Sequence, residues 1–182
     1  MASLASLIKL PLVTAGTAFF SLVTATSSMA ITLTGTTVGQ PTYNRPSTTN
    51  NPPTSLSPTA TNVPFAVNNF TVATNGVYNF NTTAPGFDYS QFLYENNFNS
   101  TQPLSNILFT NNPFNSGSKS FNYSLITGTD YFLVTSGFSN TTTGAFSTNV
   151  TPVPEPSGVG TLAFGAIGAA YLLKRRFKKI AI

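Results

Sequence analysis

The chain has 182 residues, of which 13% are aromatic and only 7% are charged, and it contains neither cysteine nor histidine. The lack of both residue types excludes disulfides, thiolate nucleophiles, sulfur-ligated metals and the usual catalytic base. The net charge of +4 is concentrated at the C-terminus, where five of the eight cations lie, whereas residues 31–152 hold two cations and three anions. The basic character therefore gives no support to nucleic-acid binding.

The first thirty residues follow the pattern of a secretory signal peptide. Lys9 supplies a positive charge, residues 10–25 form an apolar stretch, and Ser28 and Ala30 are small residues at the positions that signal peptidase inspects. A permanent membrane anchor is the alternative, but threonine and serine dilute the apolar stretch and no stop-transfer charges follow it. We therefore expect a helical leader that directs export through the translocon and is removed by signal peptidase.

Residues 31–62 are rich in threonine, proline, asparagine and serine. Few apolar side chains are available there to offset the entropy lost on ordering, so the sequence predicts an extended and largely loose segment. Within it, residues 41–46 begin and end with proline, a residue that sheets tolerate at their edges. This stretch is either an edge strand or a loop, and the sequence leaves both alternatives open.

Beyond this segment the sequence changes to short alternating runs separated by turn residues. Residues 69–73 and 77–81 flank Asn75-Gly76, and two short runs around an asparagine–glycine pair predict a tight β-hairpin. Further strands are predicted over residues 87–95 and 104–110, because paired asparagines end each run.

The same pattern continues as far as the C-terminal tail. Residues 119–125 alternate strictly, with Phe121 and Leu125 on one face. Residues 131–135 are the most apolar run, which predicts a central strand, and residues 145–150 form the last predicted strand.

About seven short strands without any helical period favour a mainly β fold. We expect one antiparallel β-sandwich over residues 63–151, because the 16 phenylalanines and seven tyrosines suffice to fill a small core. Charged side chains are scarce, so the edges of its sheets are poorly protected against pairing with another chain.

The tail, residues 152–182, contains three parts in a fixed order. The motif Val153-Pro154-Glu155-Pro156-Ser157 is predicted to be stiff and extended, because proline fixes φ. The uncharged residues 158–173 predict a membrane-spanning helix, which at about 24 Å is short for a bilayer core of about 30 Å. A basic cluster in residues 174–182 then holds the chain end in the cytoplasm. Its members are Lys174, Arg175, Arg176, Lys178 and Lys179.

This ordered tail resembles the PEP-CTERM sorting signal of bacterial exported proteins. The likeness rests on Pro154-Glu155-Pro156, the glycine- and alanine-rich span and the terminal cations together, and it covers about one-sixth of the chain. It implies that an exosortase, a membrane-embedded cysteine protease-transpeptidase, cuts near the motif and releases or transfers the body at the cell surface. A plain membrane anchor is the alternative, although an anchor needs no Pro-Glu-Pro motif.

The strand-rich body is similar to the bacterial pre-peptidase C-terminal domain, which is a jelly-roll-like β-sandwich. The likeness rests on residues 88–95, 104–110 and 125–134. Some related domains bind calcium through acidic residues, which implies Asp88 and Asp130 as candidate ligands here. The loop that commonly carries paired aspartates in that family holds asparagines in this chain, so no strong metal site is predicted.

No catalytic constellation is predicted. Ser-His-Asp and Cys-His arrangements need residue types that the chain lacks. Asp88 and Glu95 lie an odd number of residues apart, so one regular strand places them on opposite faces. Asp130 lies in a predicted turn, where aspartate commonly bonds the backbone. Tyr89 and Tyr94 offer aromatic faces either for stacking on sugars or for packing a core.

The sequence therefore predicts a non-enzymatic protein without a cofactor, exported to the cell surface or the extracellular matrix. Its precursor is held in the membrane with a cytoplasmic C-terminus. The predicted partners are the translocon, signal peptidase, an exosortase, the membrane and exopolysaccharide. A surface module that binds carbohydrate or calcium is the alternative function, and a secreted hydrolase that uses Asp88, Glu95 or Asp130 is a third.

Overall fold

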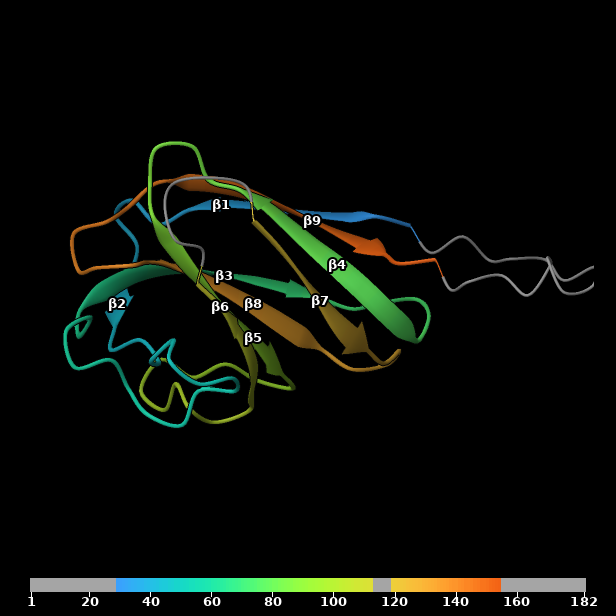
Figure 1. Ribbon diagram of the computed structural model, residues 1–182, viewed down its shortest axis with the longest axis horizontal. Helices are drawn as coiled ribbons and strands as arrows, with labels where there is room; N and C mark the ends of the chain where they lie inside the picture. The colour runs from blue at the N-terminus through green and yellow to red at the C-terminus, as the bar shows by residue number, and fades with distance from the viewer. Residues whose placement is uncertain (1–28, 113–118, 155–182) are drawn as a thin grey trace, which may run out of the picture.

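The computed structural model of the chain describes residues 29–112 and 119–154 (Figure 1). The predicted leader helix and the predicted membrane-spanning tail helix both lie outside these residues. All regular secondary structure in the described part is strand, which confirms the mainly β class. Within the described part, no helix has the length and apolar character needed to cross a membrane.

The described residues form two antiparallel sheets that lie face to face, as the sandwich prediction requires (Figure 1). One sheet has four strands in the order β1-β9-β4-β7, and the other has five strands in the order β2-β3-β8-β5-β6. The strands are β1 (Ile31–Thr36), β2 (Thr42–Tyr43), β3 (Val63–Phe70), β4 (Gly76–Thr83), β5 (Tyr89–Glu95), β6 (Ile107–Asn111), β7 (Lys119–Leu125), β8 (Tyr131–Gly137) and β9 (Ala145–Pro152).

The strand pairs are nested along the chain. β1 pairs with β9, β3 with β8, β4 with β7, and β5 with β6. The chain is therefore laid out like one long hairpin that turns between β5 and β6. This hairpin is rolled up, because β9 also pairs with β4 and β8 also pairs with β5.

The main apolar core fills the space between the sheets and draws on both. The four-stranded sheet contributes Phe80 and Val150, and the five-stranded sheet contributes Leu93 and Leu133, all with no exposed surface. Phe80 stacks on Phe121 with the ring centroids 4.5 Å apart. Because side chains alternate along a strand, the neighbouring residues Asn81 and Asn149 of the four-stranded sheet face outward and are exposed.

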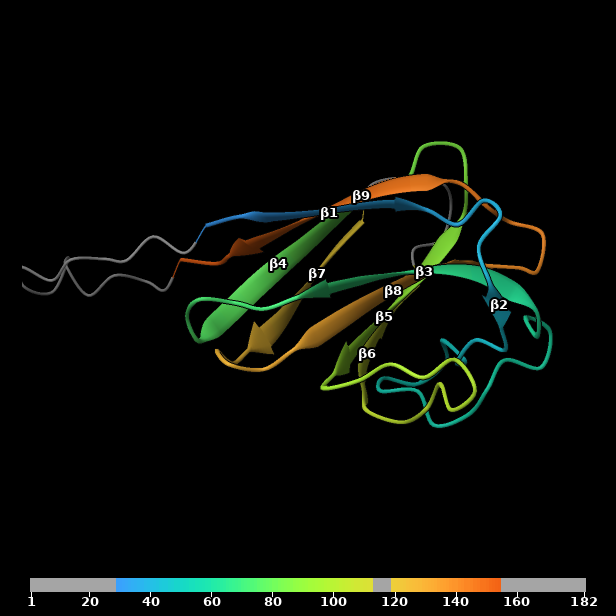
Figure 2. The same cartoon turned by 180° about the vertical axis from the view of Figure 1, so that it is seen from behind.

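The outer face of the five-stranded sheet is covered by the loops that connect β2 to β3 and β5 to β6 (Figure 2). Phe92, Tyr94 and Val134 lie on this face and are nonetheless 0% exposed. They form a second apolar cluster with Ala60 and Phe98, one from each of the two loops. β5 is therefore buried on both faces, and four of its seven residues are apolar or aromatic.

The segment predicted to be loose, residues 31–62, instead contributes a strand to each sheet. β1 pairs with β9 along its whole length, from Ile31 opposite Val150 to Thr36 opposite Ala145. β2 is a two-residue edge strand on β3, so the edge-strand alternative is confirmed in that stretch. The sheets thus begin at residue 31 rather than at residue 63. The apolar groups that order this segment come from distant strands, which its own composition does not reveal.

The predicted hairpin around Asn75-Gly76 is wrong. β3 and β4 lie in different sheets and do not pair. A type I′ turn requires positive φ at both central residues, and Asn75 does not have it. The chain crosses between the sheets instead, and Phe70 and Phe80 meet in the core with their ring centroids 5.9 Å apart. Burial of two apolar faces against each other outweighs the local turn preference.

Other strands agree with the predictions more closely. β7 has the predicted bounds, and β8 is the central strand of its sheet, as its apolar sequence indicated. β6 begins at Ile107 rather than at Leu104. The preceding residues form turns instead, in which the Gln102 N–H donates to the Asn99 carbonyl at 3.0 Å.

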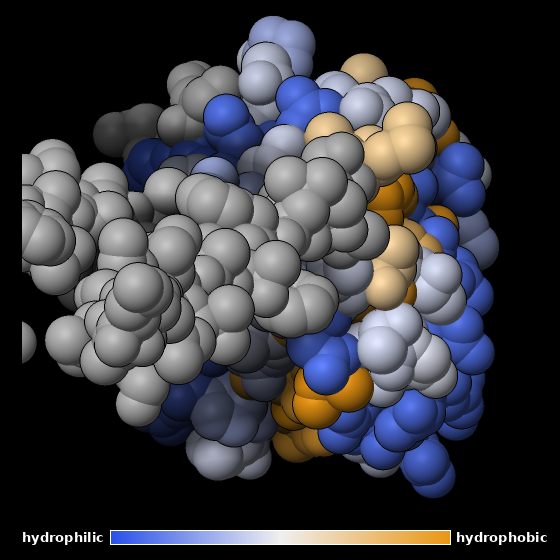
Figure 3. Space-filling view, turned by 90° about the vertical axis from the view of Figure 1, so that its right-hand side faces the viewer, coloured by the Kyte–Doolittle hydropathy of each residue, from blue (hydrophilic) through white to orange (hydrophobic). Residues whose placement is uncertain are grey.

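The described chain enters and leaves the sandwich at one end. Ile31 at the start of β1 lies opposite Val150 near the end of β9. We call this the entry end; the opposite, far end holds the loops at residues 37–41 and 138–144, on the left of Figure 1. Figure 3 views the entry end, where hydrophilic residues cover most of the described surface and apolar residues form only small patches.

Candidate functional site

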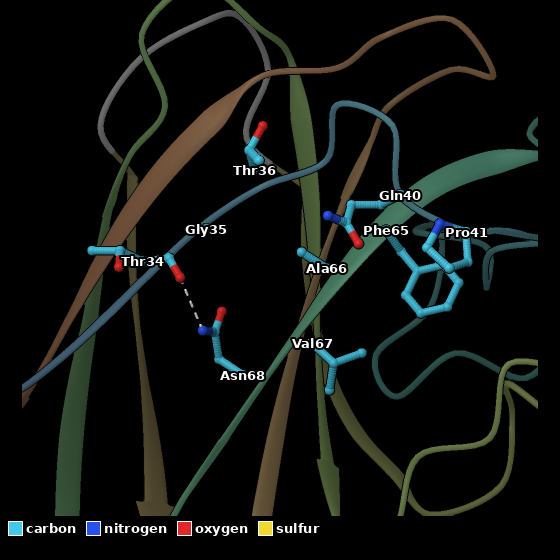
Figure 4. A pocket seen from close by; sticks show the side chains of 9 residues that line it. All are labelled: Thr34, Gly35, Thr36, Gln40, Pro41, Phe65, Ala66, Val67 and Asn68. Carbon is cyan, nitrogen blue, oxygen red and sulfur yellow. Dashed lines mark hydrogen bonds between the residues drawn. The ribbon is translucent and has the colours of Figure 1, made fainter.

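A groove opens at the side of the sandwich, between β1 and β3 (Figure 4). The positions that face inward here are Gly35 and Ala66, whereas further along the same strands they are Leu33 and Phe70, which fill the core. Gly35 must stay small, because a Cβ atom there would lie 2.8 Å from Cζ of Phe146. Phe146 thus fills the space inside Gly35, and Ala66 packs against the same buried cluster, so the groove lies along the gap between the two strands and outside this cluster.

Each end of the groove is closed by polar contacts or by a loop. At one end Asn68 Nδ2 donates to the carbonyl of Thr34 at 3.1 Å, and this bond bridges the two sheets (Figure 4). Asn68 Oδ1 is enclosed and has no hydrogen-bond partner among the described residues. At the other end, Gln40 and Pro41 come from the loop that follows β1.

The two strands that border the groove turn other side chains outward. Thr34 and Thr36 are exposed and point away from β3, and Phe65 and Val67 point away from β1, with Val67 41% exposed (Figure 4). The volume of about 530 Å³ lies in the range of small-molecule sites, and no charged side chain lines the groove.

A cluster of four polar side chains lies deep between the sheets, away from the groove. Gln91 Oε1 accepts a hydrogen bond from Thr82 Oγ1 at 3.0 Å. Gln91 Nε2 donates to Thr148 Oγ1 at 3.0 Å and to Thr135 Oγ1 at 3.2 Å. These four side chains are at most 1% exposed. Because their bonds are made within the cluster, they stabilise the interior and offer no group to a ligand.

Arg45 is buried although it carries a charge, with 4% of its surface exposed. Nε and Nη2 donate to the carbonyl of Phe138 at 3.2 and 3.0 Å, and Nη1 donates to the carbonyl of Pro46 at 3.0 Å. The guanidinium also lies 5.1 Å from the centroid of the Phe138 ring. Burial lowers the pKa of Arg45, an effect that nearby Tyr43 and Asp88 oppose. Arg45 therefore joins the β2–β3 loop to the β8–β9 loop.

The structure does not bring together the two candidate calcium ligands. Asp88 directly precedes β5 and Asp130 directly precedes β8, and the first residue of β5 lies opposite the last residue of β8. Asp88 is therefore at the far end and Asp130 at the entry end, about 20 Å apart along the strands. Among residues 29–112 and 119–154, no three acidic, cysteine or histidine side chains gather at a metal-binding distance. Tyr89 and Tyr94 are 0% exposed and pack the interior.

Two residues of the predicted sorting motif are described, and they follow the sheet directly. The Val153 N–H donates to the carbonyl of Val77 at 2.8 Å, and Pro154 is exposed. Ala30, at the predicted signal peptidase site, is exposed immediately before β1. The other predicted processing and stop-transfer residues lie outside the described residues. They are Ser28, Glu155, Pro156, Ser157, Lys174, Arg175, Arg176, Lys178 and Lys179.

Sequence reasoning did not find the groove, although the β1 side of the groove has a recognisable sequence pattern. A glycine at an inward position of the alternating run Thr34-Gly35-Thr36 indicates a close approach of another group. The other half, around Ala66 and Asn68, has the pattern of an ordinary strand. Nothing in the sequence shows that these two segments face each other across a seam.

Comparison of the chain with models of known protein families finds no match, and comparison with curated proteins also finds none. The groove itself offers neutral hydrogen-bonding groups beside apolar surface. Gln40 and Asn68 reach into the gap between the two strands, and their side-chain amides both donate and accept, whereas Ala66 supplies the apolar surface (Figure 4).

Proposed function

We propose that this chain is a non-enzymatic exported protein of the cell surface or extracellular matrix, sorted by an exosortase through its PEP-CTERM-like tail. One observation carries the proposal: the start of β1 and the end of β9 are neighbours at the entry end. The leader and the tail therefore attach at the same end. A sandwich held by its tail presents its far end and its sides to the surroundings.

The position of the sorting motif supports the same proposal. All nine strands in the described residues precede Val153, so cleavage near the motif removes none of them. Val153 is bonded to Val77, which means that the sheet ends where the motif begins. An enzyme that reads Pro154-Glu155-Pro156 releases a body whose sheets are complete.

We further propose that the body is a jelly roll of the kind found in the pre-peptidase C-terminal domain. The nested pairing, rolled so that β9 meets β4 and β8 meets β5, supports this architecture. A chain without histidine or cysteine, whose Asp88 and Asp130 lie at opposite ends of a sheet, is better suited to structural or adhesive contacts than to catalysis.

Carbohydrate binding on the cell surface is the second candidate function, and the groove between β1 and β3 is the observation that favours it. Calcium binding is less well supported, because the distance between Asp88 and Asp130 prevents them from sharing one ion.

The proposal is tested by the C-terminus of the surface-exposed protein in its native host. Mass spectrometry of tail peptides is applied to the wild type, to the double variant Pro154→Ala and Pro156→Ala, and to Pro152→Ala. Pro152 is the matched control, because it lies in β9 outside the motif. We expect the wild type and Pro152→Ala to lose the tail and the double variant to keep it. Deletion of the host exosortase should also preserve the tail.

An intact C-terminus on every surface copy of the wild type contradicts the processing proposal. The same conclusion follows if deletion of the exosortase leaves the tail peptides unchanged.

A further inference from the structure

The two sheets of the sandwich differ in what covers their outer sides. Loops pack against the outer side of the five-stranded sheet, where Phe92 and Tyr94 are buried (Figure 2). The outward side chains of the four-stranded sheet are instead exposed or half-buried, and we call this surface the outer face. Its members are Thr32, Thr34 and Thr36 of β1, Ala145, Ser147, Asn149 and Thr151 of β9, Val77, Asn79, Asn81 and Thr83 of β4, and Ser120, Asn122 and Ser124 of β7.

The outer face is polar, uncharged and even in height. All of its members except Val77 and Ala145 are serine, threonine or asparagine. No side chain among them is longer than asparagine, so none stands far above its neighbours. Lys119 is the only charged residue in these four strands, and strand alternation places it on the inner side with Phe121. The outer face thus offers many hydrogen-bonding groups and no ionic partner.

Strand pairing arranges these side chains in rows. Thr32 lies opposite Asn149, and Asn149 lies opposite Asn81. Asn81 in turn lies opposite Ser120, so one row crosses the whole sheet. Neighbouring members of the outer face are about 4.8 Å apart across the strands and about 6.8 Å apart along a strand. Donors and acceptors therefore recur at regular intervals in two directions, as the hydroxyl groups of a repeating polysaccharide also do.

Hydrogen bonds within the outer face hold several of its amides in place. Thr32 Oγ1 donates to Asn149 Oδ1 at 2.9 Å, and Asn79 Nδ2 donates to Asn122 Oδ1 at 2.7 Å. Each bonded amide keeps its second polar atom, which is Oδ1 of Asn79 and Nδ2 of Asn122 and Asn149. Because these side chains are already held, a ligand that bonds them costs less side-chain entropy.

The dimensions of the outer face favour an extended polymer over a protein. Its outermost strands are about 14 Å apart and six residues of a strand span about 20 Å, which gives an area of roughly 300 Å². A stable protein interface buries about 800 Å² on each partner and is centred on aromatic or arginine side chains, which the outer face lacks. A polymer needs less area per copy, because many copies on one cell surface bind it together.

We propose that the outer face binds an extended, uncharged polysaccharide, with several sugar units contacting the rows of hydroxyls and amides at once. The proposal rests on the proposed surface function and names the part of the body that contacts exopolysaccharide. Side chains that both donate and accept match sugar hydroxyls, whereas no ionic group is present to offset the desolvation of a charged polymer. The strands run from the entry end to the far end, so the outer face stays accessible when the entry end faces a membrane.

Biolayer interferometry on the purified full-length chain tests this assignment. The detergent carries no sugar head group, and the sensors carry dextran, mannan or hydroxyethyl cellulose as neutral polymers. We expect binding to at least one of them, and soluble oligosaccharides of that polymer should compete better as their length increases, because longer chains reach more rows. Alginate is the charged comparison: any binding to it comes from the basic tail and should not respond to changes in the outer face.

Two pairs of substitutions separate the outer face from the rest of the surface. Asn81→Ala with Asn149→Ala removes two amides from one row, and we expect about 5- to 30-fold weaker binding to the neutral polymer. Asn69→Ala with Asn97→Ala is the matched control, because both residues are exposed outside the outer face, and binding should not change. Asn81→Lys places a long charged side chain within the row and should abolish binding. If circular dichroism shows that Asn81→Lys is unfolded, Ser120→Lys takes its place.

The inference is overturned if no neutral polymer binds, if both outer-face variants bind as well as the wild type, or if the matched control loses binding equally. Light scattering examines a second copy of the chain as the occupant. A wild-type dimer that the lysine variant converts into a monomer also overturns the inference. None of these outcomes affects the sorting proposal, because that proposal depends on tail peptides alone. Loss of tail processing likewise leaves the polymer measurement unaffected.

Discussion

Replacing Gln91 with methionine tests the buried polar cluster most directly. The substitution keeps a similar volume but removes three side-chain hydrogen bonds, to Thr82, Thr135 and Thr148. Thr82 and Thr148 still bond to each other at 2.8 Å, whereas the described residues offer the Thr135 hydroxyl no other side-chain partner. One hydroxyl left without a bond costs about 1–3 kcal/mol, and the lost bonds add to that cost. We expect the free energy of unfolding to fall by about 2–4 kcal/mol.

Urea unfolding followed by far-UV circular dichroism measures this loss. A second variant combines Gln91→Met with Thr135→Val, so that the amide and the hydroxyl that depends on it disappear together while Thr82 and Thr148 stay bonded to each other. Because matched removal of both partners is nearly neutral, the double variant should be more stable than the sum of the single changes indicates. A loss below about 1 kcal/mol for Gln91→Met, or no recovery in the double variant, refutes this account of the cluster.

Three further predictions concern other parts of the molecule. Burial raises the pKa of Tyr43 and of Tyr94 above the usual 10.0, so both remain protonated in the fold but ionise in the unfolded chain. Below about pH 10 this contribution to the free energy of unfolding is fully present, and above it the free energy should fall by about 1.4 kcal/mol per pH unit for each tyrosine. Urea unfolding at several alkaline pH values measures the change, and a free energy that stays constant with pH contradicts the prediction. Arg45→Lys loses the planar fork that reaches two carbonyls and should destabilise the fold by about 1–3 kcal/mol in the same assay, whereas an unchanged midpoint argues against the loop-joining role. Asn68→Ala removes a half-exposed bridge, so its stability loss should stay below about 1.5 kcal/mol, and a larger loss shows that the bridge supports the core.

The sequence predicts well where a strand's own pattern decides its place. β7 alternates so regularly that its bounds are predicted correctly, and the apolar run of β8 correctly indicates a central strand. In both cases burial depends on residues within the run, which periodicity detects. The mainly β class follows from the same signals.

The sequence fails where burial depends on partners far along the chain. Residues 44–62 contain few apolar groups, yet Ala60 is buried because Phe92, Tyr94 and Val134 supply the other half of the cluster. The predicted hairpin fails for a related reason, since its two apolar faces meet across the core instead of side by side. The groove is the extreme case, because neither β1 nor β3 shows alone that the two strands border it from different sheets.

The place of β9 in its sheet determines how the body responds to a mechanical pull. Residues 147–150 of β9 are hydrogen-bonded to β1 on one side and to β4 on the other. Tension that enters from the C-terminal side runs along the strand, perpendicular to these bonds. The two rows of bonds are therefore loaded together in shear, and all of them resist the pull at once. An edge strand that is peeled away from its sheet instead loses its bonds one at a time.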